Sequence, residues 1–301
     1  MQDLSIIIPA YKGRFLGETL DSLCQQTDKN FTLYIGDDCS PENLKEICDR
    51  YTKKIDLHYI RFDQNIGHHD LAAHWERCID LGNEPYIWLF SDDDIMPNDA
   101  VERINTAIRT ERKELYRLPL LVVNEQQNLL GGNPIFETPA QTAIDSLMEK
   151  FSGTRPSAAI EYVFSRDLYL REKKFEHYPV AWCSDDATWF KFALSAGQIT
   201  NLPGAPVYWR QSIGYNISSS QNLSAKKMAA TTMFLGWLYH AMTNHKTAIT
   251  PAFLKALKQY IKTILCISLN KDFTRKELFR LSTRVAYFSP ILAFKILFRY
   301  L

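Results

Sequence analysis

The sequence predicts an α/β protein in which a mostly parallel, mixed sheet carries helices on both faces, followed by a helical C-terminal region. Short apolar, β-branched runs alternate with segments of helical spacing through about the first 110 residues. Polar residues follow directly after three of these runs, and the pattern from 218 to 301 is almost wholly helical. Strands that alternate with helices form parallel sheets covered on both faces. Each helix brings the chain back to the end of the sheet where the previous strand began, so the next strand runs in the same direction.

The first half contains four predicted strands. Residues 4–8 form a β-branched run that Pro9 ends, and residues 86–90 form a fully apolar run. The predicted elements are, in chain order, a strand at 4–8, a helix at 15–26, a strand at 31–35, a helix from Pro41, a strand at 57–60, a helix at about 69–81 and a strand at 86–90. In open sheets of this kind, ligands bind beyond the carboxyl ends of the strands. We therefore expect a site where Tyr11, Asp38 and residues 91–94 converge.

The pattern loosens after about residue 115, with turn residues at 131–134. A strand at 158–164, a helix at 187–196 ended by Gly197, and a short strand at 207–210 follow. We expect one domain over 1–215, made of the halves 1–110 and 111–215, and a helical region over 216–301.

Composition bounds the class of protein. The 301 residues are 46% hydrophobic, and 35 Lys and Arg balance 34 Asp and Glu, so we expect a substantial core and no binding of nucleic acid. Six scattered cysteines without a C-x-x-C pair argue against a zinc site or a disulfide framework. Because the chain shows no leader pattern and no run long enough to span a bilayer, we expect a cytoplasmic protein.

Three aspartates, Asp92, Asp93 and Asp94, follow Ser91 directly after the apolar run. Adjacent like charges repel, so their place at a strand end suggests a bound cation, and oxygen ligands favour Mg²⁺ or Mn²⁺, which would in turn hold phosphate. A solvated acidic turn before a helix, with Asp99 as a cap, explains these residues about as well at this point. The phosphate loops of dinucleotide-binding and P-loop proteins do not occur in the sequence.

Five short motifs, in this order and spacing, resemble family 2 glycosyltransferases, whose nucleotide-diphospho-sugar transferase fold is called GT-A. The motifs are 5–11 (SIIIPAY), 20–31 with its QQT, 35–40 (IGDDCS), 65–67 (NIG) and 91–95 (SDDDI). They cover about the first 110 residues, and Asp185-Asp186 extends the match more loosely to about 210. The resemblance implies that 1–110 bind a nucleotide and that 111–215 bind an acceptor.

The resemblance also implies which residues contact the nucleotide. Pro9 and Tyr11 correspond to the strand end and the aromatic that flank it, and Asp38 to the aspartate that hydrogen-bonds the base. A carboxylate that accepts from a uracil N–H rejects bases without that donor. Arg210 falls where related enzymes place a basic residue facing the diphosphate. Packing at the strand end is the alternative for Tyr11, and a surface ion pair for Arg210.

The acidic run resembles the D-x-D motif of the family, which binds the metal that bridges the two phosphates. Ser91 stands where the first aspartate is usual. The resemblance therefore implies Asp93 as the direct ligand, Asp94 as another candidate, and Asp92 directed toward the ribose or the metal. One carboxylate with phosphate oxygens and waters suffices for Mn²⁺ or Mg²⁺.

Asp185-Asp186 resembles the Glu-Asp pair of the family, whose second member is the general base. This implies that Asp186 takes the proton of an acceptor hydroxyl while the nucleoside diphosphate leaves from the opposite face, which inverts the anomeric configuration. Capping of the following helix is the alternative for both aspartates. Trp182 and Trp189, with Asp185, suit contacts to the donor or acceptor sugar, although a place in the core explains the two rings about as well.

Residues 290–301 are nearly all apolar, with Lys295 and Arg299 on one helical face. At about 1.5 Å per residue this helix is too short to span a bilayer. Basic residues upstream favour a helix that lies in an anionic membrane surface. A helix docked on the catalytic domain, or in a homodimer interface, is the alternative.

These observations lead us to expect a metal-dependent, inverting glycosyltransferase that takes a sugar from a UDP-sugar. We expect a lipid-linked saccharide as acceptor, in bacterial surface polysaccharide or lipopolysaccharide synthesis at the inner face of the cytoplasmic membrane. Two alternatives stay open: a non-catalytic sugar-nucleotide-binding protein and a sugar nucleotidyltransferase of the same fold. The latter usually carries a Gly-rich loop with Arg and Lys after the first strand, and residues 10–17 lack that loop.

Overall fold

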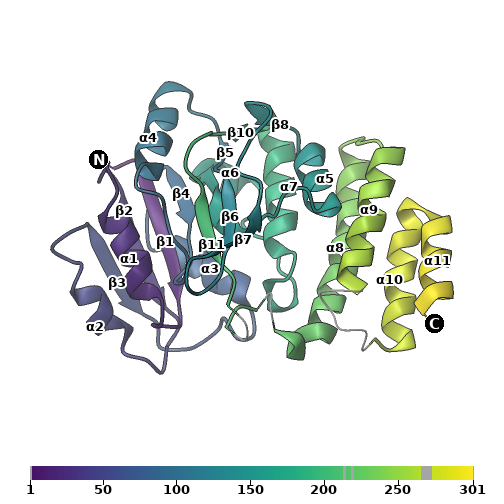
Figure 1. The fold of residues 1–301 in the computed structure, drawn as a ribbon, viewed down its shortest axis with the longest axis horizontal. Helices are drawn as coiled ribbons and strands as arrows, with labels where there is room; N and C mark the ends of the chain where they lie inside the picture. The colour runs from purple at the N-terminus through teal and green to yellow at the C-terminus, as the bar shows by residue number, and fades with distance from the viewer. Residues whose placement is uncertain (1, 213–214, 218–219, 266–272, 301) are drawn as a thin grey trace.

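The computed structural model describes residues 2–212, 215–217, 220–265 and 273–300. The sheet lies at one end of the molecule and a group of helices at the other, with the C-terminus among those helices (Figure 1). Leu301 and the side chain of Arg299, which belong to the predicted membrane helix, lie outside the described part of the chain.

The main sheet has eight strands in the order β3-β2-β1-β4-β9-β5-β10-β8. Their bounds are β1 Leu4–Ala10, β2 Thr32–Asp37, β3 Leu57–Arg61, β4 Tyr86–Leu89, β5 Leu115–Arg117, β8 Ala140–Gln141, β9 Tyr162–Ser165 and β10 Ile199–Asn201. β1 pairs in parallel with β2 and β4, and β2 with β3, whereas β9 is antiparallel to β4 and β5. The four strands predicted in the first half are therefore adjacent and parallel, and their carboxyl ends meet at one edge.

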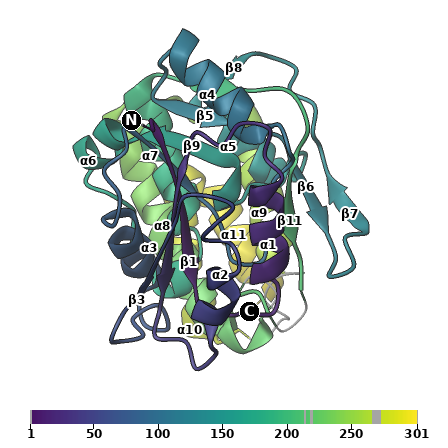
Figure 2. The ribbon, with the colours of Figure 1, turned by 90° about the vertical axis from the view of Figure 1, so that its left-hand side faces the viewer.

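Helices cover both faces of this sheet. Their bounds are α1 Leu16–Cys24, α2 Leu44–Asp49, α3 Leu71–Ile79, α4 Ala100–Thr110, α6 Arg166–Arg171 and α7 Ser184–Ala196. Ile6 and Ile8 of β1 pack in one core cluster with α1, while Ile7 between them belongs to the other cluster with α3. This alternation follows from the two-residue period of a strand. Figure 2 shows α1 and α3 on opposite sides of β1, and the predicted fold class is confirmed.

A second sheet of three strands, in the order β11-β6-β7, lies next to the acidic turn. Its bounds are β6 Leu120–Val123, β7 Leu129–Gly132 and β11 Val207–Arg210. β11, which was predicted, pairs in parallel with β6, and an isolated bridge joins Tyr208 of β11 to Ile95. The sequence did not predict β5, β6, β7, β8 and β10, which are short strands in the part of the chain after residue 110 where the periodic pattern loosens.

The C-terminal helices continue the core of the sheet region. Their bounds are α8 Ser224–Asn244, α9 Pro251–Thr263, α10 Arg275–Phe288 and α11 Pro290–Tyr300, and α5 Ala143–Ser152 packs between them and the sheet. Phe151 of α5 stacks on Tyr260 of α9 with ring centroids 4.3 Å apart. Among the described residues, no helix combines the length and the hydropathy that a bilayer crossing requires.

Candidate active site

A cleft of about 630 Å³ opens beyond the carboxyl ends of β1, β2 and β4. The predicted site residues that line it are Pro9, Tyr11, Asp38, Asp92, Asp93, Asp94, Trp182, Asp185 and Asp186. Arg210 and Trp189 are the predicted site residues that do not line it. Two acidic groups therefore line the same cleft. One comes from residues 91–94, directly after β4, and the other from the start of α7.

Asp92 joins the acidic turn to the end of β1. Its Oδ2 accepts hydrogen bonds from the backbone N–H groups of Tyr11 at 2.9 Å and Lys12 at 3.0 Å. Burial, together with the neighbouring charge of Asp93, raises the pKa of Asp92 to about 7. The side chain of Tyr11 is 39% exposed, so its ring is not packed at the strand end but lies at the cleft.

Asp38 is buried at the end of β2 and is held from three sides. Its two carboxylate oxygens accept hydrogen bonds from the backbone N–H of Ile66 at 2.9 Å and of Gly67 at 2.8 Å, and Arg77 donates to the same group. These contacts explain why a short motif at 65–67 accompanies the Asp-Asp turn. Burial lowers the pKa of the adjacent His74 to about 3, so this histidine is neutral beside the carboxylate.

Asp93 and Asp94 differ in their partners. Asp93 accepts hydrogen bonds from two side chains, the hydroxyl of Ser91 at 2.6 Å and the amide of Asn216 at 3.0 Å. Asp94 accepts from the backbone N–H of Arg210 at 2.7 Å. Burial raises the pKa of both carboxyls, and for Asp94 the neighbouring Asp93 adds to the effect. Ser91 thus positions Asp93 instead of supplying a further carboxylate.

Arg210 is fully buried beneath the acidic turn. Its Nε donates to the backbone carbonyl of Asp93 at 2.8 Å, and its guanidinium also donates to the carbonyl of Glu125 and pairs with Glu18 at 2.7 Å. The predicted alternative of a surface ion pair does not describe this arrangement, because the cation is enclosed. Arg210 faces the peptide backbone of the turn and not the cleft.

The acidic turn fits a divalent cation that is completed by ligands from a substrate. Within the described residues, no three His, Cys, Asp or Glu side chains are gathered into a metal site of their own. Asp93 nevertheless has its carboxylate in the cleft, and its hydrogen-bond partners are side chains, which can move. Burial of the three adjacent carboxyls disfavours their charged forms. A cation with diphosphate oxygens would relieve this cost.

The second acidic group lies at the start of α7. Asp186 forms an ion pair with Lys150 of α5. Burial is the main cause, and the negative charge of Asp186 the second, of a rise in the pKa of Asp185 to about 7. Both aspartates lie in the first turn of the helix, but the cap position is Cys183 and no side chain caps this helix, so the capping alternative does not describe them; both line the cleft.

The two tryptophans have different surroundings. Trp182 lines the cleft, and its Nε1 donates to Thr231 of α8 at 3.0 Å. Trp189 is 3% exposed and stacks on Tyr162 with ring centroids 4.7 Å apart. The core role therefore describes Trp189, whereas Trp182 forms part of the cleft wall.

The cleft is also lined by residues that were not predicted, among them Lys12, Lys150 and Tyr260. Lys12 donates to the backbone carbonyl of Tyr215, and its ammonium lies 3.9 Å from the centre of that ring. Its place directly after Tyr11 could have indicated it. Lys150 and Tyr260 come from helices whose sequence pattern shows only a buried and an exposed face, so no signal in the sequence marks them.

The fold and the cleft define a class of protein, the GT-A glycosyltransferases. S. aureus TarS, solved with UDP-GlcNAc, superimposes with a TM-score of 0.70 over 98% of this chain and 82% of its own, at 16% identity. The Pyrobaculum calidifontis mannosyltransferase PcManGT, solved with GDP-Man and Mn²⁺, superimposes with a TM-score of 0.54 over 95% of this chain and 73% of its own, at 12% identity. These likenesses establish the shared fold.

The profile of the family described as glycosyl transferase family 2 matches residues 5–194. The chain belongs to this family, so the resemblance found in the motifs is confirmed. The glycosyltransferase GlyG of Streptococcus pneumoniae is 21% identical over 282 residues, which cover 90% of this chain and 87% of the relative. The putative teichuronic acid biosynthesis glycosyltransferase TuaG of Bacillus subtilis is 26% identical over 103 residues, which cover 33% of this chain and 39% of TuaG.

Proposed function

We propose that the protein is an inverting glycosyltransferase that moves a sugar from a UDP-sugar to a saccharide acceptor. The observation that carries this proposal is that two separate acidic groups, Asp92 to Asp94 and Asp185-Asp186, line one cleft. A single positioned base is what an inverting transfer requires of the protein, and the other acidic group suits a cation bound to diphosphate. The complex of TarS with UDP-GlcNAc supports the choice of a UDP-sugar.

In this proposal residues 1–110 bind the nucleotide. Pro9 and the exposed ring of Tyr11 flank it, Asp38 selects uracil, and Asp92 contacts the ribose. Asp38 already accepts from two backbone N–H groups and from Arg77, which fix its orientation, and a carboxylate has about four acceptor sites in all, so one stays available for the base. Arg210 acts on the diphosphate site indirectly, by holding the backbone of Asp93.

Asp186 is the catalytic base in this proposal. It accepts the proton of an acceptor hydroxyl while the oxygen of that hydroxyl bonds to the anomeric carbon and the bond from that carbon to the diphosphate breaks. The electron pair of the broken bond goes to the diphosphate oxygen. In this proposal Lys12 balances this negative charge; it lines the cleft, and its backbone N–H donates to Asp92 at 3.0 Å. Asp185 and Trp182 contact the sugars from residues 111–215.

A divalent cation, Mn²⁺ or Mg²⁺, held by Asp93 with Asp94 as a further ligand, would supply positive charge to the departing diphosphate. The test of the function is hydrolysis of a panel of UDP-sugars and GDP-sugars by the purified chain, with Mn²⁺, with Mg²⁺ and with EDTA. Release of UDP from one UDP-sugar in the presence of metal is the expected result. Binding of donors without release would favour the non-catalytic alternative, and formation of donor from a sugar phosphate and UTP would favour the nucleotidyltransferase.

We also infer that the acceptor is lipid-linked, in the synthesis of a bacterial surface polysaccharide, with the protein bound to the inner face of the cytoplasmic membrane. The observation that supports this is the outer face of α11. Ala293 and Ile296 are buried, whereas Ile291, Phe294 and Phe298 are 70%, 67% and 85% exposed. The helix lies at the far end of the molecule from the sheet, beyond α8 and α9 (Figure 1). TuaG, whose name assigns it to teichuronic acid synthesis, agrees with a polysaccharide product.

Vesicle binding tests this inference. The double variant F294S/F298S should lose binding to vesicles that contain anionic lipid, because it removes two exposed rings from the membrane-facing side. I135S is the control, since Ile135 is an apolar residue that is also well exposed, at 70%, but lies far along the chain from α11. Loss of a dimer in F294S/F298S, without any vesicle binding by the original protein, would identify α11 as a homodimer interface instead.

A further inference from the structure

The proposed base forms an ion pair with a lysine that no family motif of this chain includes. Lys150 and Asp186 are 36 positions apart, on α5 and α7, and the ammonium of Lys150 donates to Oδ1 of Asp186. Both side chains line the cleft, and they are 24% and 8% exposed. A partly buried charge pair of this kind fixes the orientation of a carboxylate much more firmly than a pair in water.

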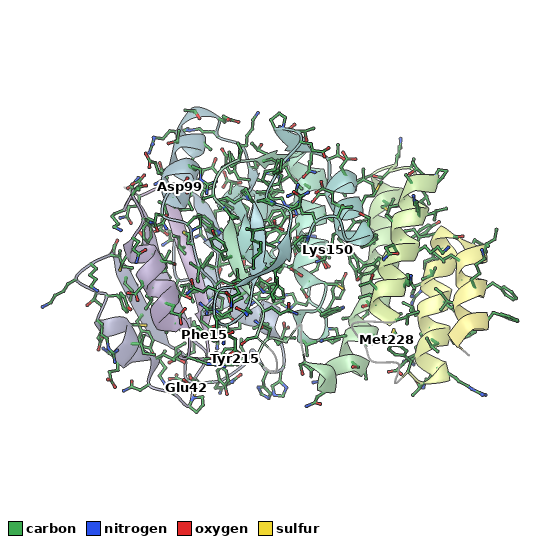
Figure 3. The ribbon with its side chains drawn as sticks, viewed as in Figure 1. Phe15, Glu42, Asp99, Lys150, Tyr215 and Met228 are labelled. Atoms are coloured by element: carbon green, nitrogen blue, oxygen red, sulfur yellow. The ribbon has the colours of Figure 1, made fainter. Side chains whose placement is uncertain are left out.

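Tyr260 of α9 braces the two helices that carry this pair. Its ring stacks on Phe151, the residue after Lys150, with centroids 4.3 Å apart. Its hydroxyl lies 3.4 Å from the sulfur of Cys183, the residue before α7 begins. Figure 3 shows Lys150 on α5 at the junction of the sheet and the C-terminal helices. Tyr260 thereby contacts the chain next to Lys150 on one side and the chain just before α7 on the other.

Among the described residues, Lys150 is the cation that pairs with Asp186. The titratable groups that face Asp186 are Asp185 on the same helix, Cys183, Lys150 from α5 and Tyr260 from α9. Burial and nearby negative charge raise the pKa of Cys183 and of Tyr260, so both are neutral. Burial alone would lower the pKa of Lys150, but Asp186 and Asp185 raise it, so the lysine stays charged. Two carboxylates therefore share one ammonium.

We propose that Lys150 is a positioning residue of the reaction, which holds Asp186 toward the acceptor and keeps it able to accept a proton beside Asp185. This inference rests on the proposed function, because it assigns a partner to the proposed base. Without the ammonium the two carboxylates repel each other, the pair retains one proton to higher pH, and that proton is no longer directed to Asp185. In the molecules that carry the proton on Asp186 the base cannot accept another, so the proton-accepting form is depleted at neutral pH.

The test compares the original protein with K150M, K150R and K191M, using the best donor from the hydrolysis panel. In K150M, kcat at pH 7 should fall about tenfold or more, and the acid limb of its pH profile should move up by about one pH unit or more. K150R should keep the position of the acid limb. K191M is the matched control, because Lys191 is on α7 and pairs with Glu176 at 2.7 Å with a similar exposed fraction of 15%, but does not line the cleft.

Thermal unfolding without substrate gives a readout that does not depend on transfer. The loss of stability in K150M should be nearly constant up to about pH 6 and grow as the pH rises through about 7 toward about 9, because repulsion within the pair appears only as both carboxylates ionise, and D186N should remove this growth. K150Q replaces K150M in both measurements if K150M does not fold. Three results for K150M would each overturn the role of Lys150. They are an acid limb at the same pH as in the original protein, a change in KM alone, and a stability loss that does not depend on pH. A protein that hydrolyses no donor but shows the pH-dependent stability loss would count against the glycosyltransferase and not against the charge role of Lys150.

Discussion

The carboxylate of Asp38 accepts a 2.8 Å hydrogen bond from the backbone N–H of Gly67. A Cβ atom at position 67 would lie 2.5 Å from Oδ2 of Asp38, well inside van der Waals contact. The glycine is therefore required by the close approach of the carboxylate, and not by its backbone angles. The proposed base-recognition residue is held by a turn about thirty residues further along the chain.

G67A should displace Asp38 and weaken UDP binding. Loss of one hydrogen bond to a charged group corresponds to about 1.5–3 kcal/mol, so we expect the Kd for UDP to rise at least about tenfold. Isothermal titration calorimetry measures this change. G131A is the control, because a Cβ at Gly131 meets no atom within 4 Å. Equal affinity in G67A and the original protein would show that Asp38 does not take part in nucleotide binding.

Replacement of Arg210 should lower the stability of the fold, because its guanidinium donates to two backbone carbonyls. R210M removes donors to the carbonyls of Asp93 and Glu125, while the freed Glu18 is 45% exposed and stays hydrated. We expect a loss of about 2–4 kcal/mol in the free energy of unfolding, measured with urea, from one buried and one partly buried acceptor left without their donor. A variant of full stability that has lost only UDP affinity would instead support direct contact between Arg210 and the diphosphate.

The sequence predicted the strands of the first half and the family because these features are local. The apolar run in β1 and the aspartates after β4 need no knowledge of distant residues. Arg210 shows the limit of such reasoning, since its family position was recognised but its burial depends on the pairing of β11 with β6. Lys150 and Tyr260 were missed for the same reason: their roles arise from the packing of α5 against α9, which no short motif records.

D93A should abolish the metal dependence of UDP binding. Asp93 is the aspartate of the turn whose carboxylate is held by the side chains of Ser91 and Asn216, so it is the one best placed to turn to a cation. Calorimetric titration of UDP with Mn²⁺ and with EDTA should differ for the original protein and agree for D93A. S91A, which removes only a hydroxyl donor to Asp93, should retain most of the difference. A metal effect that persists in D93A would exclude Asp93 as the principal ligand.

Asp185 predicts a pH dependence of stability. Burial and Asp186 raise its pKa from the model-peptide value near 4 to about 7, so the folded state binds a proton more tightly than the unfolded state. The stability from this group is complete at pH values below about 4 and is lost as the pH rises through about 7. The Tm of D185N relative to the original protein should therefore increase between pH 5 and pH 8. A constant difference across this range would contradict the raised pKa.

D186N should abolish transfer and donor hydrolysis while UDP binding is unchanged. The amide keeps the size of the side chain but does not accept a proton, so we expect kcat to fall about 100-fold or more, the range for loss of a positioned base. Turnover is measured as UDP release, and affinity by calorimetry on the same preparation. D145N, on the first turn of α5 outside the cleft, is the control for a lost aspartate charge. Turnover retained in D186N but lost in D185N would move the role of base to Asp185, whose raised pKa also suits it, and would leave Asp186 as the anchor for Lys150.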